Sequence, residues 1–294
     1  MDVYRTPDER FVGLPDYPFE PRYVEMDSLR MHYVDEGPRE GDPVLLLHGE
    51  PTWSFLYRSV IAALLADDVR CLAPDYYGFG RSDKPVEREF YTFDRHYRSV
   101  AELVGLLDLM RITVVVQDWG GPIGLRLAVE HPERVARLVI LNTGIFSGRP
   151  PSDTWLQFRA FVRRLGTDMR PGQLVNLTCG NTLTDDVVAA YDAPHPTPES
   201  KTGVVMFPEL VPTDPNHPSA PAMMDVREGI GRWDRPALVL FSDSDPIFSP
   251  KAAERMAERI PGAGPPEFVQ GAGHFLQEQR GEEIGERIAR FLRE

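Results

Sequence analysis

Short, uninterrupted apolar runs alternate with longer stretches of helical periodicity through the first half of the chain. Strands buried on both faces of a parallel sheet read as continuous apolar runs, and parallel neighbours must be joined by a crossover that is usually a helix. The pattern therefore predicts an α/β fold with a doubly wound, mostly parallel sheet. The apolar runs are residues 44–47, 69–73, 112–116 and 137–141, and the helix-period stretches are residues 53–65, 93–107 and 121–130.

The alternation stops after Asn142 and resumes near residue 237. Between them lies an irregular segment with an amphipathic helix expected at 155–165 and a proline-dense stretch at 194–221, which is typical of neither regular helix nor central strand. We therefore predict an α/β core of residues 1–143 and 231–294, interrupted by a helical cap of residues 144–230. The other elements expected in the core are an edge hairpin (23–26 with 29–34), strands at 237–241 and 267–270, and helices at 250–259 and 281–292.

The charge balance and the cysteines argue against several classes of protein. With 45 acidic and 32 basic side chains the net charge is −13, which repels nucleic-acid phosphates and anionic membrane surfaces. No apolar run approaches the roughly 18 to 20 residues that span a bilayer, and residues 1–10 lack the pattern of a secretory signal. Cys71 and Cys179 lack disulfide or zinc spacing and are expected to be buried. We expect a cytoplasmic monomer or small homo-oligomer that binds neither nucleic acid nor membrane.

A single acidic residue, Asp118, stands between the apolar run 112–116 and a glycine-rich helix start. The sequence reads V-V-V-Q-D-W-G-G-P-I-G, a buried strand that turns into a helix with small residues in the turn. This is typical of a nucleophile elbow with aspartate in the place of serine, although Val116 stands where the motif has glycine. The following helix points its positive dipole end at the site, which favours a negative charge. The alternative is that Asp118 only caps this helix.

Asp245 and His274 complete a candidate catalytic set. Each follows a predicted strand, in the sequences S-D-S-D-P and G-A-G-H-F. The order nucleophile, acid, histidine along the chain is that of the α/β-hydrolase fold, and the carboxyl ends of the strands are the edge where such sheets bind ligands. The alternatives are a surface turn for Asp245, with Asp243 as its rival, and a helix cap for His274. The other histidines lack this context and are expected to be structural or solvated: His32, His96, His131, His195 and His217.

The glycine loop after strand 44–47 reads H-G-E-P-T-W. In this architecture such a loop supplies one backbone N–H to an oxyanion hole, and the residue after the nucleophile, Trp119, supplies the other. Glu50 is an unexpected charge in this loop. The loop 75–85 lacks the G-x-x-x-x-G-K-[ST] spacing of a phosphate loop and is expected to be a structural turn. The glycines after Trp119 lack the dinucleotide-binding spacing.

Taken together, these motifs resemble the haloalkane dehalogenases, in particular the first subfamily, whose loop reads H-G-E-P-T-W and whose acid follows the strand after the cap. The resemblance implies that Asp118 is the nucleophile, His274 the base and Asp245 its orienting acid. It also implies that Trp119 binds halide and that Glu50 holds the hydrolytic water. The likeness runs nearly end to end, through residues 5–11, 48–53, 78–85, 117–121, 191–194, 232–234 and 245–250.

A second halide-binding tryptophan, from the cap, is also implied by the resemblance. Trp155 matches this place best, whereas a shifted alignment puts Phe158 there. The chemistry is consistent: an aspartate, ionised at neutral pH, displaces halide without a base, and His274 then activates water. Two indole N–H groups suit a halide because they only donate. The implied ligands are a haloalkane, water and the halide product, with no metal or organic cofactor.

Three other functions remain open from the sequence. An epoxide hydrolase shares the aspartate, the acid and the histidine, but it needs acidic donors, normally two cap tyrosines, and Tyr191 is the only tyrosine in the cap segment. A non-catalytic small-molecule binder is the alternative from another class, and the intact catalytic set argues against it. A cofactor-free oxygenase on the same scaffold is the third.

Overall fold

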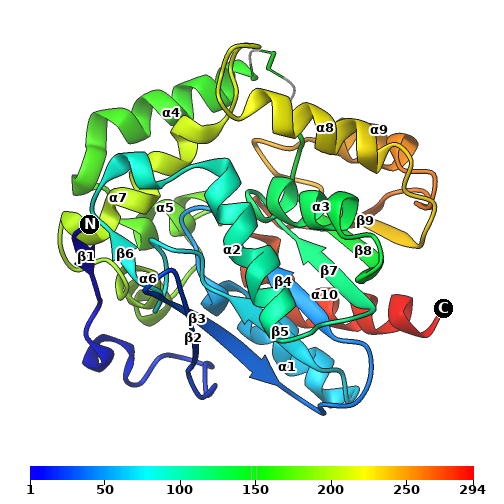
Figure 1. The fold of residues 1–294 in the computed structure, drawn as a ribbon, viewed down its shortest axis with the longest axis horizontal. Helices are drawn as coiled ribbons and strands as arrows, with labels where there is room; N and C mark the ends of the chain where they lie inside the picture. The colour runs from blue at the N-terminus through cyan, green and yellow to red at the C-terminus, as the bar shows by residue number, and fades with distance from the viewer. Residues whose placement is uncertain (147, 150) are drawn as a thin grey trace.

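The computed structural model describes residues 1–146, 148–149 and 151–294, and an eight-stranded sheet forms its centre (Figure 1). The strand order is β10-β9-β8-β7-β4-β5-β3-β2. All pairs from β10 to β5 are parallel, and β3 and β2 add an antiparallel hairpin at one edge. The predicted mostly parallel sheet and edge hairpin are confirmed. The eight strands of this sheet are β2 (Arg22–Met26), β3 (Leu29–Glu36), β4 (Val44–Leu47), β5 (Cys71–Pro74), β7 (Ile112–Val116), β8 (Val135–Leu141), β9 (Ala237–Ser242) and β10 (Glu267–Val269).

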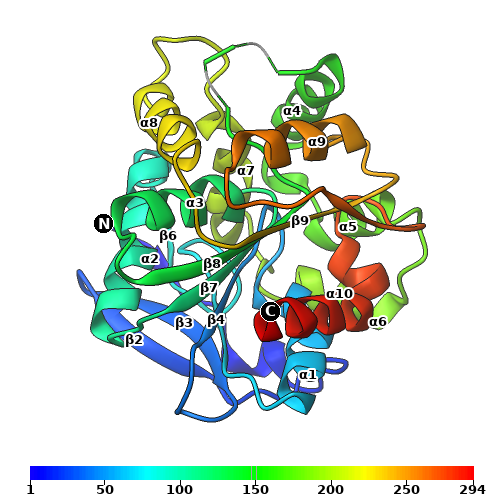
Figure 2. The same cartoon turned by 90° about the vertical axis from the view of Figure 1, so that its right-hand side faces the viewer.

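Helices cover both faces of this sheet. Helices α2 and α3 lie on one face with α8 beside α3, and α1 and α10 lie together on the other (Figure 2). Every residue of β4, β5, β7 and β9 is therefore buried, which explains why these strands read as continuous apolar runs. These helices, with α9, are α1 (Arg58–Ala66), α2 (Phe93–Leu106), α3 (Gly120–Glu130), α8 (Ala220–Ile230), α9 (Pro250–Arg259) and α10 (Leu276–Arg293).

Two differences from the expected core are small. A second, two-stranded antiparallel sheet, β1 (Val3–Tyr4) with β6 (Lys84–Pro85), joins the N-terminal segment to the 78–85 loop and was not predicted. Helix α10 begins five residues earlier than the expected 281, and it has a kink with non-helical backbone angles at Arg280. None of the helices in the described residues is both long and apolar enough to cross a membrane.

The segment between β8 and β9 is more helical than the sequence pattern predicts. Helix α4 matches the expected one, but α5, α6 and α8 lie where an irregular chain was expected, so that expectation is wrong. Helices α5 and α6 have only eight residues each, too few to give a clear period. The start of α5 is favoured by Pro171 in its first turn. The bounds are α4 (Asp153–Leu165), α5 (Pro171–Thr178), α6 (Asp185–Asp192) and α7 (Thr202–Met206).

The proline-dense stretch is also partly helical, against expectation. Helix α7 and the 3-10 helix η6 (Phe207–Leu210) both lie within it. Helix α7 fits because its five residues contain no proline, and Pro208 lies in the first turn of η6, where a missing N–H costs nothing. The prolines therefore shorten the helices here and do not exclude them.

A buried ionic cluster joins α6 to the core. Tyr191 of α6 donates to the Glu278 carboxylate, which also pairs with the guanidinium of Arg58. The Arg58 and Glu278 side chains are only 7% and 2% exposed. Nearby, the indole N–H of Trp53 donates to the carbonyl of Ala190 over 3.3 Å. Helix α6 is thus fixed to the core by polar contacts that are shielded from water.

We expect Glu278→Leu to lower the free energy of unfolding by about 3 to 5 kcal/mol, because it leaves the Arg58 cation buried without its partner. The double variant Arg58→Met/Glu278→Leu should recover much of this loss, since neither charge remains. Denaturant unfolding of the three proteins measures both effects. Strictly additive losses in the double variant would contradict the prediction.

Candidate active site

Asp118 lies at the sharp turn between β7 and α3, with a left-handed φ of +47°. A residue other than glycine has a strained backbone in this conformation, and it needs support from its surroundings. The support comes from the neighbouring strand end: the Asp118 N–H donates to the Asn142 carbonyl over 3.0 Å, and the Thr143 hydroxyl donates to the Asp118 carbonyl over 2.6 Å. The turn expected from the sequence is present, and Asp118 is its central residue.

Glycines make this close approach possible. A Cβ on Gly120 would lie 2.1 Å from the carbonyl oxygen of Leu47, and one on Gly49 would lie 2.3 Å from the Cβ of Asp118. The valine in the elbow also has a partner: a Cβ on Gly124 would lie 2.5 Å from Cγ1 of Val116. The turn therefore accepts Val116 because Gly124 provides the space that the generic motif obtains from a glycine.

His274 contacts two carboxylates. Its Nδ1 lies 2.9 Å from Oδ2 of Asp245, and its Nε2 lies 3.7 Å from Oδ2 of Asp118. The other oxygen of Asp245 accepts the N–H of Ile247 at 2.7 Å, which fixes the carboxylate. Asp243, the rival acid, instead accepts the N–H of Gly271 at 3.0 Å. The structure thus joins Asp118, His274 and Asp245 in one row, as the sequence predicts.

The surroundings of His274 determine its protonation. Burial between Phe248 and Phe275 alone would lower the pKa of the ring, but the Asp245 carboxylate, with help from Asp118, raises the pKa above its ordinary value. A carboxylate only accepts hydrogen bonds, so the contact with Asp245 places a proton on Nδ1, and Nε2 is the nitrogen on the side of Asp118. This is the arrangement of a general base that serves the Asp118 side chain.

The Asp118 carboxylate is held by backbone donors. The Glu50 N–H donates to Oδ1 over 2.8 Å, and the Trp119 N–H also bonds to the carboxylate. Burial raises the pKa of Asp118, and His274 and these two N–H groups oppose that shift. The two amides are the ones that the sequence assigns to an oxyanion hole, and both face Asp118.

Glu50 has an unusual environment. Its side chain is buried, and Oε1 has no hydrogen-bond partner among the described residues. Burial, with the nearby Asp118 carboxylate, raises the pKa of Glu50 well above its ordinary value. The raised pKa disfavours a second negative charge beside Asp118.

Asn142 was not identified from the sequence, although it organises the site. It directly follows β8, and its side-chain N–H₂ donates to the carbonyls of Gly273 and His274 over 3.0 Å each. The same amide joins Ser242 at the end of β9. A polar residue at the carboxyl end of a buried strand was the available signal. Asn142 holds the loop that carries His274 against two strand ends.

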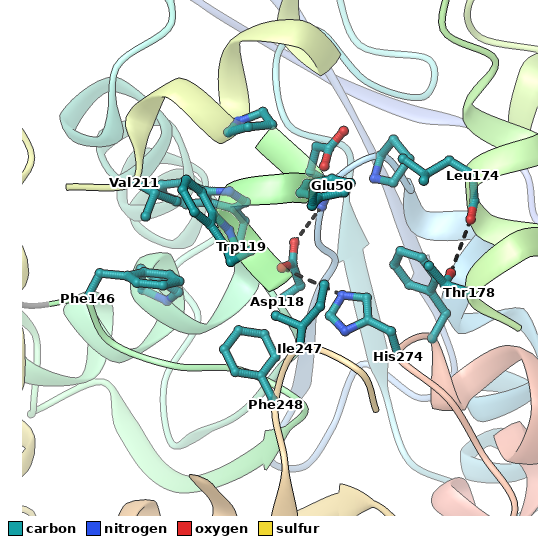
Figure 3. A pocket seen from close by; sticks show the side chains of 16 residues that line it. Glu50, Asp118, Trp119, Phe146, Leu174, Thr178, Val211, Ile247, Phe248 and His274 are labelled. Carbon is teal, nitrogen blue, oxygen red and sulfur yellow. Dashed lines mark hydrogen bonds and ion pairs between the residues drawn. The ribbon is translucent and has the colours of Figure 1, made fainter. Parts of the chain in front are cut away.

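An apolar pocket opens above these residues (Figure 3). In Figure 3, Asp118 lies between Glu50 and His274. Trp119 and Trp155 also line the pocket, and no acceptor is found for either indole N–H among the described residues, whereas that of Trp53 is bonded. The apolar side chains of the lining are Pro51, Pro122, Phe146, Phe158, Leu174, Pro208, Val211, Ile247, Phe248 and Phe275.

The structure also places the other residues that the sequence analysis singled out. The 75–85 loop is a structural turn: Asp75 is buried and accepts the N–H groups of Ser54 and Arg81, each over 2.8 Å. Both cysteines are free and buried. In the part of the chain that the structure describes, no three histidine, cysteine or acidic side chains come together as a metal site would require. Of the histidines set aside, His32, His96 and His195 are buried, whereas His131 and His217 are not.

Fold and site together define a class of protein. A parallel sheet with helices on both faces, an acidic elbow after β7 and a histidine after β10 are the features of an α/β hydrolase. The family profile described as "alpha/beta hydrolase fold" matches residues 42–281.

Known relatives give the family within this class. "Haloalkane dehalogenase 1" of Mycobacterium tuberculosis is 47% identical over 98% of both chains. The haloalkane dehalogenase of Mycolicibacterium paratuberculosis is 44% identical over 98% of this chain and 97% of the relative. A haloalkane dehalogenase of Paraglaciecola agarilytica, described as tetrameric, superposes with a TM-score of 0.93 at 36% identity, over 98% of this chain and 97% of the other. The chain belongs to the haloalkane dehalogenase family.

We expect Gly49→Ala to lower the free energy of unfolding by about 1 to 3 kcal/mol, because the new Cβ would overlap the Asp118 side chain. The matched control is Gly264→Ala, at an exposed glycine with open space around its Cβ position, which should change stability by less than about 0.5 kcal/mol. Thermal or denaturant unfolding measures both. Equal stability of the two variants would show that the loop moves freely away from Asp118.

Proposed function

We propose that this chain hydrolyses the carbon–halogen bond of haloalkanes, giving an alcohol, a halide ion and a proton. The observation that carries the proposal is a carboxylate nucleophile in an apolar pocket that also contains indole N–H donors without protein acceptors, those of Trp119 and Trp155. An apolar pocket suits an alkyl chain, and indole donors suit the anion that leaves it. The names of the relatives agree with this reaction.

In the first step, an Asp118 carboxylate oxygen attacks the halogen-bearing carbon. A carbon–oxygen bond forms while the carbon–halogen bond breaks, and the halide leaves with the electron pair of the broken bond. The product is an alkyl ester on Asp118. Partial burial limits the hydration of the carboxylate and so makes it a better nucleophile, and the Glu50 and Trp119 N–H groups hold it in place.

In the second step, water hydrolyses this ester. Nε2 of His274 takes a proton from the water as its oxygen adds to the carboxyl carbon of Asp118. The backbone N–H groups of Glu50 and Trp119 hold the negative charge that develops on the carboxyl oxygen. Collapse of this intermediate releases the alcohol and restores the carboxylate, and Asp245 stabilises the imidazolium meanwhile.

We also propose that the Glu50 side chain holds the hydrolytic water. Its carboxyl group lines the pocket beside Asp118, and Oε1 is buried without a partner among the described residues. A buried polar atom without a partner is costly, and a water molecule shared with His274 would satisfy it. Burial and the nearby Asp118 carboxylate raise the pKa of Glu50, which weakens the charge repulsion between the two side chains.

The halide would lie between Trp119 and a donor from the inserted segment. Trp155 is the best candidate because it lines the pocket and is 6% exposed. Phe158, the alternative position, also lines the pocket but has no donor. We propose Trp119 and Trp155 as the halide-binding pair.

The inserted segment, residues 144–230, is proposed to act as a cap domain on a core of residues 1–143 and 231–294. The pocket is lined by α4, α5 and η6 on one side and by the elbow and the β4, β9 and β10 loops on the other. A pocket formed at the junction of two parts of a chain is a common place for a small-molecule site. The packing of this cap would set the preferred length of the haloalkane.

The epoxide hydrolase alternative is less well supported. It requires acidic donors directed at the epoxide oxygen, and Tyr191 is buried against Glu278 and does not line the pocket. A non-catalytic binder would have no need for a base aligned with Asp118 at 3.7 Å. The dehalogenase reaction uses Asp118, His274 and Asp245 together with the two backbone donors that face Asp118.

We expect His274→Gln to accumulate the alkyl ester on Asp118, because displacement of halide needs no base while hydrolysis does. Mass spectrometry after mixing with a bromoalkane should find the alkyl group on the peptide that contains Asp118, with one equivalent of bromide released. Asp118→Ala is the blank and should release none. If folded wild-type protein released no halide from bromo- and chloroalkanes of varied length, the proposed function would be wrong.

We expect Trp155→Phe to weaken halide binding by about 10-fold, because it removes one charge-assisted hydrogen bond from a site shielded from water. Quenching of tryptophan fluorescence by bromide measures the affinity. Phe158→Leu is the matched control on the same helix and should change bromide affinity little. A larger loss of bromide affinity in Phe158→Leu than in Trp155→Phe would instead place the second halide contact at position 158.

A further inference from the structure

Gln117, the residue directly before Asp118, has a fully buried side chain beside His274. Its Nε2 lies 3.3 Å from Nε2 of the His274 ring and 3.3 Å from the His274 carbonyl oxygen. Its Oε1 has no hydrogen-bond partner among the residues that the structure describes. The reaction steps above assign no role to this amide, although it contacts the atom that takes the proton from water.

The carbonyl of His274 fixes which end of the amide faces the ring. A carbonyl oxygen only accepts hydrogen bonds, so the N–H₂ end of Gln117 must point toward it. The same N–H₂ group then faces Nε2 of the ring, which must present a lone pair. A neutral imidazole with a lone pair on Nε2 carries its proton on Nδ1, and Nδ1 lies 2.9 Å from the Asp245 carboxylate.

We propose that Gln117 is a positioning residue for His274, whose amide donates to Nε2 and so holds the neutral ring with its proton on Nδ1, toward Asp245. This inference rests on the proposed function, in which Nε2 is the base. Asp245 and Gln117 contact opposite nitrogens of one ring and favour the same tautomer. Gln117 is thus a second determinant of tautomer beside the orienting acid.

The contact also favours the neutral ring over the charged one. Once Nε2 is protonated, its N–H faces the N–H₂ of Gln117, and the hydrogen bond between them is lost. The charged groups that face the ring, Asp118 and Asp245, act in the opposite direction, and the flanking Phe248 and Phe275 carry no charge. Gln117 therefore helps His274 to release its proton to solvent after each turnover.

The test is the pH dependence of alkyl-enzyme hydrolysis in Gln117→Met, which keeps the side-chain length and removes the donor. With 1-bromobutane in single turnover, the acid limb of hydrolysis should move to higher pH by about half a unit to one unit. The burst of bromide from the first step should keep its pH dependence. The control is Gln279→Met: Gln279 accepts the Gly273 N–H at 2.7 Å but does not touch the ring, so its loss should not move the limb.

An unmoved acid limb in folded Gln117→Met would overturn the proposal. NMR titration of ¹⁵N-labelled His274 is the second measurement, and it needs no turnover. It should find the pKa of the ring higher in Gln117→Met than in the wild type. If Gln117→Met does not fold, the wild-type spectrum decides, because a neutral ring with its proton on Nε2 contradicts the proposal. Absence of bromide release from the wild type contradicts the proposed function instead, and the titration still tests Gln117.

Discussion

A carboxylate held in a buried, left-handed turn is the constraint on which the other features of the site depend. Burial opposes the charge on Asp118, and the chain compensates with two backbone N–H groups, the start of α3 and the ring of His274. Each donor requires that another loop come close. The loop of Glu50, the elbow and the loop of His274 therefore meet at one edge of the sheet, and the parallel strand order brings them there.

The strain of this turn is supported by parts of the fold that carry no chemistry. Asn142 and Thr143 hold the Asp118 backbone from the end of β8, and Asn142 also fixes the loop of His274. At position 49 only glycine fits without a shift, because the Asp118 side chain fills the space that a Cβ would need. One strand end thus holds both the turn of Asp118 and the loop of His274.

The polar and the apolar groups of the pocket lie on different sides of it. The carboxylates, the imidazole and the backbone donors lie together at the strand ends, which form the floor of the pocket. Above, the walls are apolar apart from indole donors and the hydroxyl of Thr178, which is bonded to its own helix. In the proposed reaction, an alkyl chain would be bound by contact area, and only the halogen would meet hydrogen-bond donors. Helices α4, α5 and η6 form much of these walls, so the shape of the pocket depends on their packing.

The sequence alone determined the order of the core elements, the elbow at Asp118 and the place of His274 after the last strand, because strand burial and the turn at the elbow leave strong local patterns. It did not determine the short helices α5 and α6, whose eight residues carry too little period, nor the helix within the proline-dense stretch. The choice of Asp245 over Asp243, the space that Gly124 gives Val116, and the contacts of Asn142 and Gln117 with His274 were decided only by the tertiary structure. Each depends on a distance between residues far apart in the chain, and local sequence does not encode such distances.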